Sequence, residues 1–359
     1  MLIRLALLLT VLTTTNAWAW GGRGHHAICH SAVFLMKEKG LQDFLKARPH
    51  VMGHLCNIPD TFWKGQGPEQ NKIGSPTHWL DPEVLGVSLP DLPADYKKIV
   101  AKYTGADNKF DTSKKIASVP GELGSLWWRA DQFFRRAVVE GKALKKAKVP
   151  KGGKEEQDYT LPYNKAVFGF YVNLGLIGHF VGDASMPFHS TADHDGYHAG
   201  HGGIHWFYED GNINVQDEQF EGLVVPEARK LQAWMNSKDK NEKAQVAFLT
   251  VKNNIEKMRQ LTILSSQDVQ ALLDIDKISK PSEKPSPENN NTKKEAQRLK
   301  ATETMMAYTP LIIKHLSRSA ALLAAMWDEA YVQSGRPDMS KYRSYQYPFM
   351  PEFVTPDYY

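Results

Sequence analysis

The segment GHFVGDASMPFHS, residues 178–190, places two histidines and an aspartate in apolar surroundings. His179 and Asp183 are four residues apart, so on a helix their side chains lie on one face, one turn apart. Pro187 would end that helix, and the turn would bring His189 back toward the same face. Buried polar groups need partners. A hydrogen-bonded pair and a metal site both meet that need, so the rest of the chain must discriminate between them.

Further candidate ligands lie in short motifs along the chain. They are His25 in WGGRGH, Asp60 in NIPDTFW, His78 in SPTHWLD, and His205 with Glu209 in IHWFYED. Neutral imidazole and carboxylate are the ligand types of hydrolytic zinc sites, where thiolate is not needed. With the first segment, the set has five histidines and three carboxylates, which are too many for one ion. We therefore expect several ions.

Residues 1–19, MLIRLALLLTVLTTTNAWA, have the features of a signal peptide: an early arginine, an apolar core and Ala17-Trp18-Ala19 before the cleavage point. The mature chain is expected to begin at Trp20, after export to a periplasm or the medium. A free α-amine has a pKa of roughly 7.7 to 8 and can bind a metal together with its own carbonyl oxygen. The alternative is that WGGRGHH is only a flexible, glycine-rich start.

The composition is that of an ordinary globular protein, with 359 residues, 42% hydrophobic residues and a net charge of +4. That charge permits an anionic partner without requiring one. After the first 19 residues, no apolar run of about 20 residues indicates a membrane span. An oxidising compartment would allow one disulfide between Cys29 and Cys56, but two free buried thiols fit the sequence equally well.

Apolar residues at three- and four-residue spacing predict an all-α fold, and no segment alternates as a strand would. The expected architecture is one helical domain over 20–359. The predicted helical segments are 25–40, 121–144, 164–183, 226–236, 241–262 and 308–335. Residues 277–300 are rich in Pro, Ser, Asn and Lys and predict a flexible insertion away from the chemistry. The tail after Gly335 should extend over the surface.

These motifs, in this order, resemble the family of trinuclear zinc enzymes that includes the fungal single-strand nucleases of the S-one and P-one type and the zinc-dependent bacterial phospholipases C. The resemblance runs from Trp20 to about Glu209. It implies a mainly helical domain of that type and three zinc ions. One ion would be held by Asp60, His78, His179 and Asp183. A second would share Asp183 and bind Trp20, through amine and carbonyl, and His25. The third would bind His189, His205 and Glu209.

The resemblance also implies the reaction. A phosphodiester bound among three ions would be attacked by a metal-bridging hydroxide, without a protein nucleophile. Asp60 and Asp183 are the candidates for a catalytic role among the ligands. The expected enzyme is a nuclease that hydrolyses single-stranded DNA or RNA to 5′-nucleotides, with a possible 3′-nucleotidase activity. Its partners are then nucleic acid or nucleotide substrates, with no obligate protein partner.

Several residues bear on the substrate. In the nucleases, the positions of Trp79 and Asp81 line the nucleoside pocket, although Trp79 could equally be core packing. An arginine that holds phosphate in the nucleases is replaced by Trp63, and Lys64 after it could substitute as a point charge. Glu209, where the nucleases usually have Asp, favours the alternative: a phospholipase C acting on phospholipid headgroups.

The remaining histidines are not expected to be ligands. His194, His198 and His201 lie in a glycine-rich loop and are expected to be exposed, His26 and His30 to pack or face solvent, and His50, His54 and His315 to have no ligand-like neighbours. A third possibility, a non-enzymatic exported zinc-binding or adhesion protein, would use the loop histidines. It does not explain why the other ligands recur in this order.

Overall fold

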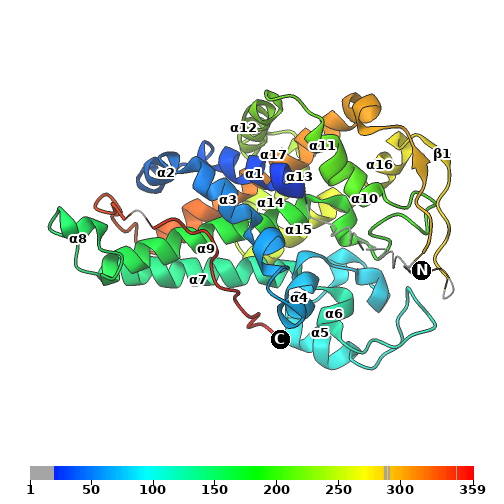
Figure 1. Ribbon diagram of the computed structural model, residues 1–359, viewed down its shortest axis with the longest axis horizontal. Coiled ribbons are helices and arrows are strands. Elements are labelled where there is room, and N and C mark those ends of the chain that lie inside the picture. The colour runs from blue at the N-terminus through cyan, green and yellow to red at the C-terminus, as the bar shows by residue number, and fades with distance from the viewer. Residues whose placement is uncertain (1–19, 287–288, 290–291, 345) are drawn as a thin grey trace, which may run out of the picture.

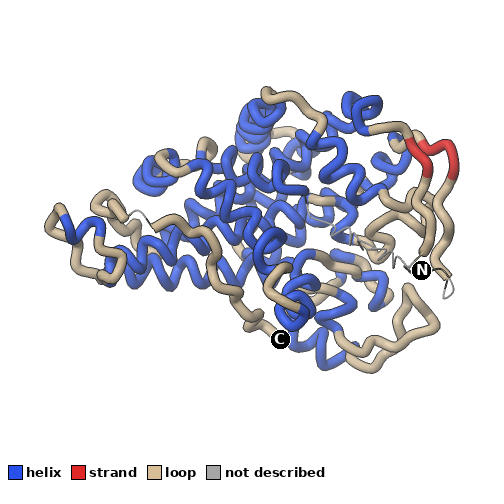
Figure 2. Tube along the Cα trace, viewed as in Figure 1, coloured by secondary structure: helices blue, strands red, loops and turns tan. Residues whose placement is uncertain are grey.

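Two long helices, α7 and α9, lie side by side and antiparallel through the centre of the molecule (Figure 1). The structure is a computed structural model, and it describes residues 20–286, 289, 292–344 and 346–359. The chain forms one mostly helical domain, as the sequence predicts, and Figure 2 shows strand only at one edge. The expected signal peptide lies outside the described residues.

The α-helices account for most of the described chain. They are α1 (Gly21–Val33), α2 (Lys39–Lys46), α3 (Pro49–Ile58), α4 (Pro68–Gly74), α5 (Tyr96–Tyr103), α6 (Val119–Leu123), α7 (Leu126–Lys146), α8 (Lys154–Gln157), α9 (Pro162–Ser185), α10 (Ile204–Trp206), α11 (Asn212–Asn214), α12 (Val224–Trp234), α13 (Lys240–Gln245), α14 (Ala247–Thr250), α15 (Asn254–Ser266), α16 (Val269–Ile275) and α17 (Ala301–Gln333). Short helical turns of other pitch are η1 (Pro59–Trp63), η2 (Ser75–His78), η3 (Pro82–Leu85), η4 (Leu89–Asp91), η5 (Pro187–Ser190), η6 (Phe207–Gly211) and η7 (Phe220–Leu223).

Segment 277–300 differs from the sequence-based expectation, which included no strand. Its ends form an antiparallel pair, β1 (Ile278–Lys280) and β2 (Gln297–Arg298). Strands of two and three residues are too short to show alternation, so the pattern could not reveal them. Residues 287–288 and 290–291 lie outside the described part of this segment.

Helix α9 is the central core element. The stretch 154–185 is long and apolar enough to cross a membrane, but 89% of its most apolar window is buried inside the protein. Small residues let other helices approach α9 closely. At Gly178 a Cβ would overlap both sulfurs of the disulfide, and at Gly182 it would lie 2.8 Å from the His25 ring. The two glycines of GHFVGD thus bring α1 and α3 against the face that carries His179 and Asp183.

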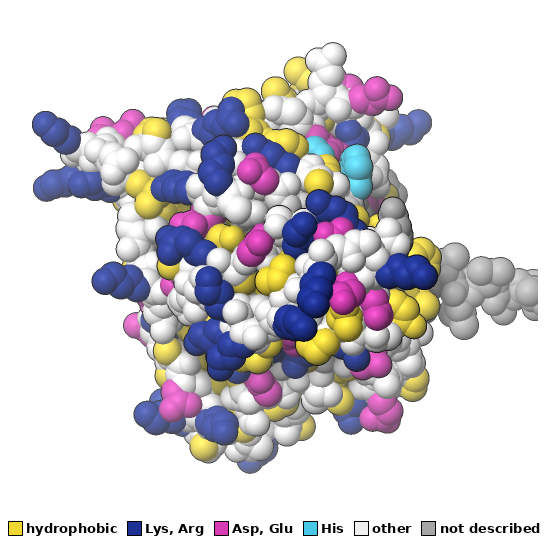
Figure 3. Space-filling view, turned by 90° about the vertical axis from the view of Figure 1, so that its left-hand side faces the viewer, with side chains coloured by type: hydrophobic (Ala, Val, Ile, Leu, Met, Phe, Trp, Pro, Cys, Tyr) yellow, Lys and Arg dark blue, Asp and Glu magenta, His cyan; other side chains and the backbone are white. Residues whose placement is uncertain are grey.

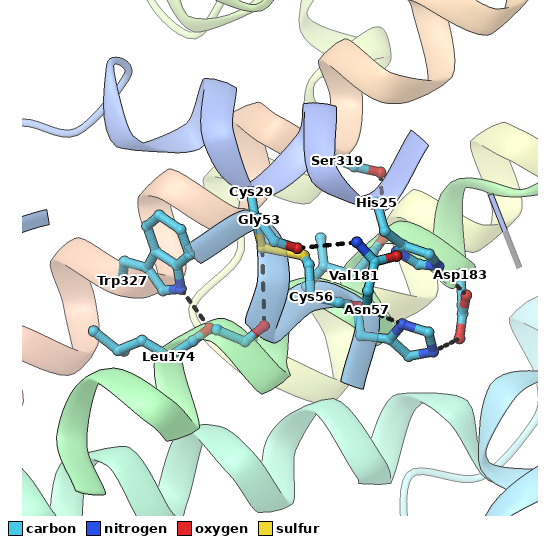
Figure 4. The surroundings of a disulfide bond; sticks show 12 residues. His25, Cys29, Gly53, Cys56, Asn57, Leu174, Val181, Asp183, Ser319 and Trp327 are labelled. Atoms are coloured by element: carbon cyan, nitrogen blue, oxygen red, sulfur yellow. Dashed lines mark hydrogen bonds and ion pairs between the residues drawn. A yellow bond between two sulfur atoms is a disulfide. The ribbon is translucent and has the colours of Figure 1, made fainter. Parts of the chain in front are cut away.

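Cys29 of α1 and Cys56 of α3 form a disulfide, with their Cα atoms 6.3 Å apart (Figure 4). This decides between the two states that the sequence left open. The bridge joins α1, which carries His25, to α3, which leads directly into η1 and Asp60. It therefore connects two of the elements that supply candidate ligands.

The C-terminal tail follows no helix or strand over the described residues after Gly335, and Figure 1 shows it running along the long helices. It is nevertheless anchored. The Trp63 indole donates a hydrogen bond to the Pro351 carbonyl (2.9 Å), and its ring packs edge-on against Phe353. Tyr358 shares a hydrogen bond with the Ser125 hydroxyl (2.8 Å). The tail thus extends over the surface as expected, and it also closes the core.

Candidate metal centre

Among the described residues, three groups of buried His, Asp and Glu could hold metal ions. The first, the α9 group, consists of His78, His179 and Asp183. His78 Nδ1 lies 3.0 Å from Asp183 Oδ2 and 2.9 Å from His179 Nε2. Asp60 Oδ1 approaches the same two rings, at 3.6 and 3.8 Å. These are the four residues that the resemblance assigns to one ion.

The second group consists of His25, Asp60 and His179. The rings of His25 and His179 are stacked, with centroids 4.1 Å apart. His25 Nε2 also lies 3.4 Å from Asp183 Oδ1, and Figure 4 shows the His25 ring directed toward that carboxylate. His25 therefore lies next to Asp183, the residue that the resemblance expects His25 to share an ion with.

The third, the α10 group, consists of His189, His205 and Glu209. His189 Nε2 is 3.1 Å from His205 Nε2, which in turn is 3.0 Å from Glu209 Oε2. As expected, α9 ends before Pro187, and the following turn returns His189 to within 3.7 Å of Asp183 Oδ1. The backbone nitrogen of Trp20 donates to Glu209 Oε2 (3.0 Å), so Trp20 contacts this group, whereas the resemblance places it with His25 and Asp183.

Asp183 is the residue that connects the groups. Its Oδ2 faces His78 and His179, whereas its Oδ1 faces His25 and His189. A carboxylate with each oxygen directed at a different pair of imidazoles can bridge two cations. The position fits the bridging role that the resemblance implies.

Two of the candidate ligand carboxylates lie in π-helical turns. Asp60 is in η1 and Glu209 is in η6. A π turn adds one residue to a helical turn, redirects the side chains that follow, and is frequent at functional sites. Both turns continue an α-helix, α3 and α10 respectively, so sequence spacing alone could not locate them.

Backbone carbonyls fix the orientation of two of the histidines. His179 Nδ1 donates to the Cys56 carbonyl (2.7 Å), and His205 Nδ1 donates to the His194 carbonyl (3.0 Å). Each bond places the proton on Nδ1 and leaves Nε2, which faces the centre, with a lone pair for a cation. Metal-binding histidines usually have such a partner on the other ring nitrogen.

The electrostatics of the site fit bound cations. Burial, and secondarily Asp60, raises the pKa of both Asp183 and Glu209 well above the usual range. Burial lowers the pKa of His78, His179 and His189 well below the usual range. Neutral imidazole is the form that binds metal. Within the described ranges, Asp60 Oδ2 and Glu209 Oε1 are buried without a hydrogen-bond partner, as expected for oxygens meant for cations.

The Lys64 side chain lies beside the candidate metal ligands, whereas the Trp63 side chain does not. The Lys64 Nζ is 2.6 Å from Asp60 Oδ1. Burial alone would lower the pKa of Lys64, but the neighbouring Asp60 outweighs it and the pKa is raised. Trp63 points instead into the core, where the buried Arg129 guanidinium lies 5.6 Å from its ring centre. The positive charge near the ligands therefore comes from Lys64.

The two predicted base-pocket residues lie next to the ligands in the chain. Leu80, between them, donates its backbone N–H to the carbonyl of His189 (2.8 Å). The Trp79 side chain is half-buried. The Asp81 Oδ1 is buried without a hydrogen-bond partner in the described chain, and burial, helped by Glu83, raises the pKa of this carboxyl well above its usual range.

Two polar networks, around His201 and His315, could not be predicted from the sequence. His201, expected to be an exposed loop residue, is mostly buried and places Nδ1 2.9 Å from Asp276. His315, expected to have no ligand-like neighbours, receives a hydrogen bond from the Tyr208 hydroxyl (2.7 Å) and contacts Asp268 (2.9 Å). Their partners are 75 and 47 residues away, so local spacing held no signal. His194 and His198 are exposed, as expected.

No protein-family model matches this chain, and a search of curated proteins found no match either.

Proposed function

We propose that this chain is an exported, zinc-dependent phosphodiesterase with three zinc ions, and that it hydrolyses single-stranded DNA or RNA to 5′-nucleotides. The observation that carries the proposal is the shared carboxylate: Asp183 faces four imidazoles from four parts of the chain, two on each oxygen. A structural ion pair needs only one partner. This convergence, in the motif order of the trizinc enzymes, is what a multinuclear centre requires.

Zinc in these groups would supply Lewis-acid charge for the phosphodiester and acidify water, so no protein nucleophile is needed. The chain's own residues do the rest. The Cys56 and His194 carbonyls keep the ligand nitrogens of His179 and His205 deprotonated. Lys64 offers a point charge to a non-bridging phosphate oxygen.

Trp79 and Asp81 would bind the nucleoside part of the substrate. An indole stacks on any base, which suits single strands of mixed sequence. A carboxyl with a raised pKa and an unpartnered oxygen can accept from, or when protonated donate to, the edge of a base. The Cys29–Cys56 disulfide supports the export component, because such bonds persist in oxidising compartments.

A second candidate function is hydrolysis of phospholipid headgroup esters. Glu209 at the last ligand position favours this alternative, since the related phospholipases C use Glu there. The same metal centre would serve both reactions, and only the surrounding pocket would differ.

The test uses the mature protein beginning at Trp20. Metal content per chain is measured first, followed by parallel hydrolysis of single-stranded DNA and of phosphatidylcholine. We expect about three zinc ions and cleavage of DNA. The same metal content with cleavage of lipid alone would select the phospholipase. Protein that binds no divalent ion would refute both candidates.

A further inference from the structure

Segments 277–300 and 142–165 are basic segments of equal length. Segment 277–300 has seven Lys or Arg residues and three Glu, and segment 142–165 has seven Lys and three acidic residues. Figure 1 places the two at opposite ends of the long axis: β1 lies at one end, and α8, within the second segment, at the other. Figure 3, which views the α8 end, shows Lys and Arg spread over that face with Asp and Glu between them.

The arm formed by 277–300 is fixed to the loop that leads into the α10 group. Asp276, just before the arm, is buried between His201 (2.9 Å) and Arg298 (3.1 Å). Arg298 also donates to the carbonyls of His201 and Gly202, and the Gly202 N–H donates to the Ser282 hydroxyl oxygen (3.0 Å). Gly202 is three residues before the candidate ligand His205. The described ends of the arm are therefore held beside the loop that leads to the candidate metal centre.

Most lysines in the described part of the arm face solvent. Lys280, Lys284 and Lys294 are exposed, and the backbone bond from Glu283 N–H to the Lys294 carbonyl (3.0 Å) continues the pairing of the strands outward. An exposed aromatic side chain, Trp206 (51% exposed), directly follows the candidate ligand His205 in the chain. Cations along a backbone path with an aromatic platform form the usual surface for single-stranded nucleic acid.

We infer that the arm is an accessory binding surface for a single-stranded polynucleotide, and that it contacts phosphates beyond the one being cleaved. The inference rests on the proposed function and adds a substrate class to it: long strands in preference to dinucleotides. A lipid surface fits the arm less well, because in its described part the exposed large apolar side chains are limited to Leu299. Membrane-surface segments need a continuous apolar face.

The test compares two triple variants with the same change of charge. The arm variant is Lys280→Gln, Lys284→Gln, Lys294→Gln, and the matched control at the far end is Lys142→Gln, Lys146→Gln, Lys148→Gln. The mature metal-loaded protein is assayed with a mixed-sequence single strand of about 30 nucleotides and with a dinucleotide, and binding of the labelled strand is followed by anisotropy at several salt concentrations.

For the arm variant we expect KM and Kd for the long strand to rise on the order of tenfold, and the slope of log Kd against log salt to fall by about 2, at about 0.7 per lost phosphate contact. Dinucleotide hydrolysis and the control variant should stay within about twofold of the unaltered protein, because neither involves the arm.

Equal effects of the two triple variants, or no effect of either, would overturn the inference while leaving the proposed nuclease intact. If the unaltered protein cleaves neither nucleic acid, the proposed function fails, and the binding data still decide whether the arm contacts a polyanion. If the arm variant impairs only the hydrolysis of vesicles of phosphatidylcholine and phosphatidylserine, the arm binds a membrane surface. The inference that it binds a polynucleotide is then wrong.

Discussion

The α9 group and the α10 group contain similar ligands but are built differently. In the α9 group, His179 and Asp183 lie one turn apart on a buried helix of 24 residues, so the helix itself sets their geometry. In the α10 group, His189 lies in a four-residue turn and His205 in a three-residue helix that continues as a π turn to Glu209. Helices this short do not hold their shape alone.

The α10 group must therefore be held by contacts from distant parts of the chain. Trp20 reaches Glu209 from the start of α1, the His194 carbonyl orients His205, and Arg298 holds the preceding loop. The α9 group should therefore be robust, whereas the α10 group should depend on the N-terminus and on segment 277–300. Asp183 is the point where a change must affect both.

The largest effect should follow from Asp183→Asn. Removing the shared charge should lower metal content by at least two ions. Several kcal/mol of charge stabilisation would be lost, which corresponds to a decrease in kcat/KM on the order of a thousandfold. Metal analysis and hydrolysis of single-stranded DNA measure the two effects, with the exposed Asp274→Asn as control. Loss of a single ion would mean that Asp183 does not connect the two groups.

A methionine added before Trp20 should remove the ion that the resemblance assigns to Trp20 and His25. The Trp20 nitrogen is buried against Glu209, and an amide nitrogen is a poor ligand compared with an amine. We expect loss of one ion and a decrease in activity of about a hundredfold, while the α9 group keeps its metal. Mass spectrometry establishes the start of the chain, and metal content is then compared. Full activity of the extended protein would remove Trp20 from the ligand set.

Removing the Cys29–Cys56 disulfide should affect the α9 side of the centre. In Cys29→Ala/Cys56→Ala, α1 and α3 are no longer joined behind His25, Asp60 and the carbonyl that orients His179. With the cysteines 27 positions apart in the sequence, the free energy of unfolding should fall by about 3 kcal/mol. Denaturant unfolding of the metal-free protein measures this. An unchanged midpoint would show that glycine-mediated packing against α9 suffices to position α1 and α3.

The difference between local and distant contacts also explains which parts of the site the sequence could predict. The pair His179 and Asp183, the helix end at Pro187 and the return of His189 follow from local rules of helix spacing and proline geometry. The same local rules could not predict the π turns at Asp60 and Glu209. A π turn shifts the helical register of the side chains that follow it, but no distinctive residue marks it in the sequence. The local rules also missed the burial of His201, whose partner Asp276 is distant in sequence.

Asp276→Asn should have a smaller effect, confined to the α10 group. The substitution weakens the contacts to His201 and Arg298 and so loosens the loop before His205. Supporting interactions of this kind affect metal affinity by about tenfold, and we expect that loss for one ion only. Competition with a chelator measures stepwise affinities. Glu283→Gln, which removes the exposed pair with Lys294 in the same arm, is the control and should change them little.

The smallest expected effect concerns Lys64, a cation beside Asp60 on the α9 side of the centre. Lys64→Ala should leave the metal content unchanged, since lysine is not a ligand, and raise KM for DNA by about fivefold, the equivalent of about 1 kcal/mol. Lys64→Arg should restore most of the binding if only charge is needed. A loss of metal in Lys64→Ala would mean instead that Lys64 holds Asp60 in place. The α9 group would then depend on a side-chain contact in the way that the α10 group does, and the contrast between the two groups would be one of degree.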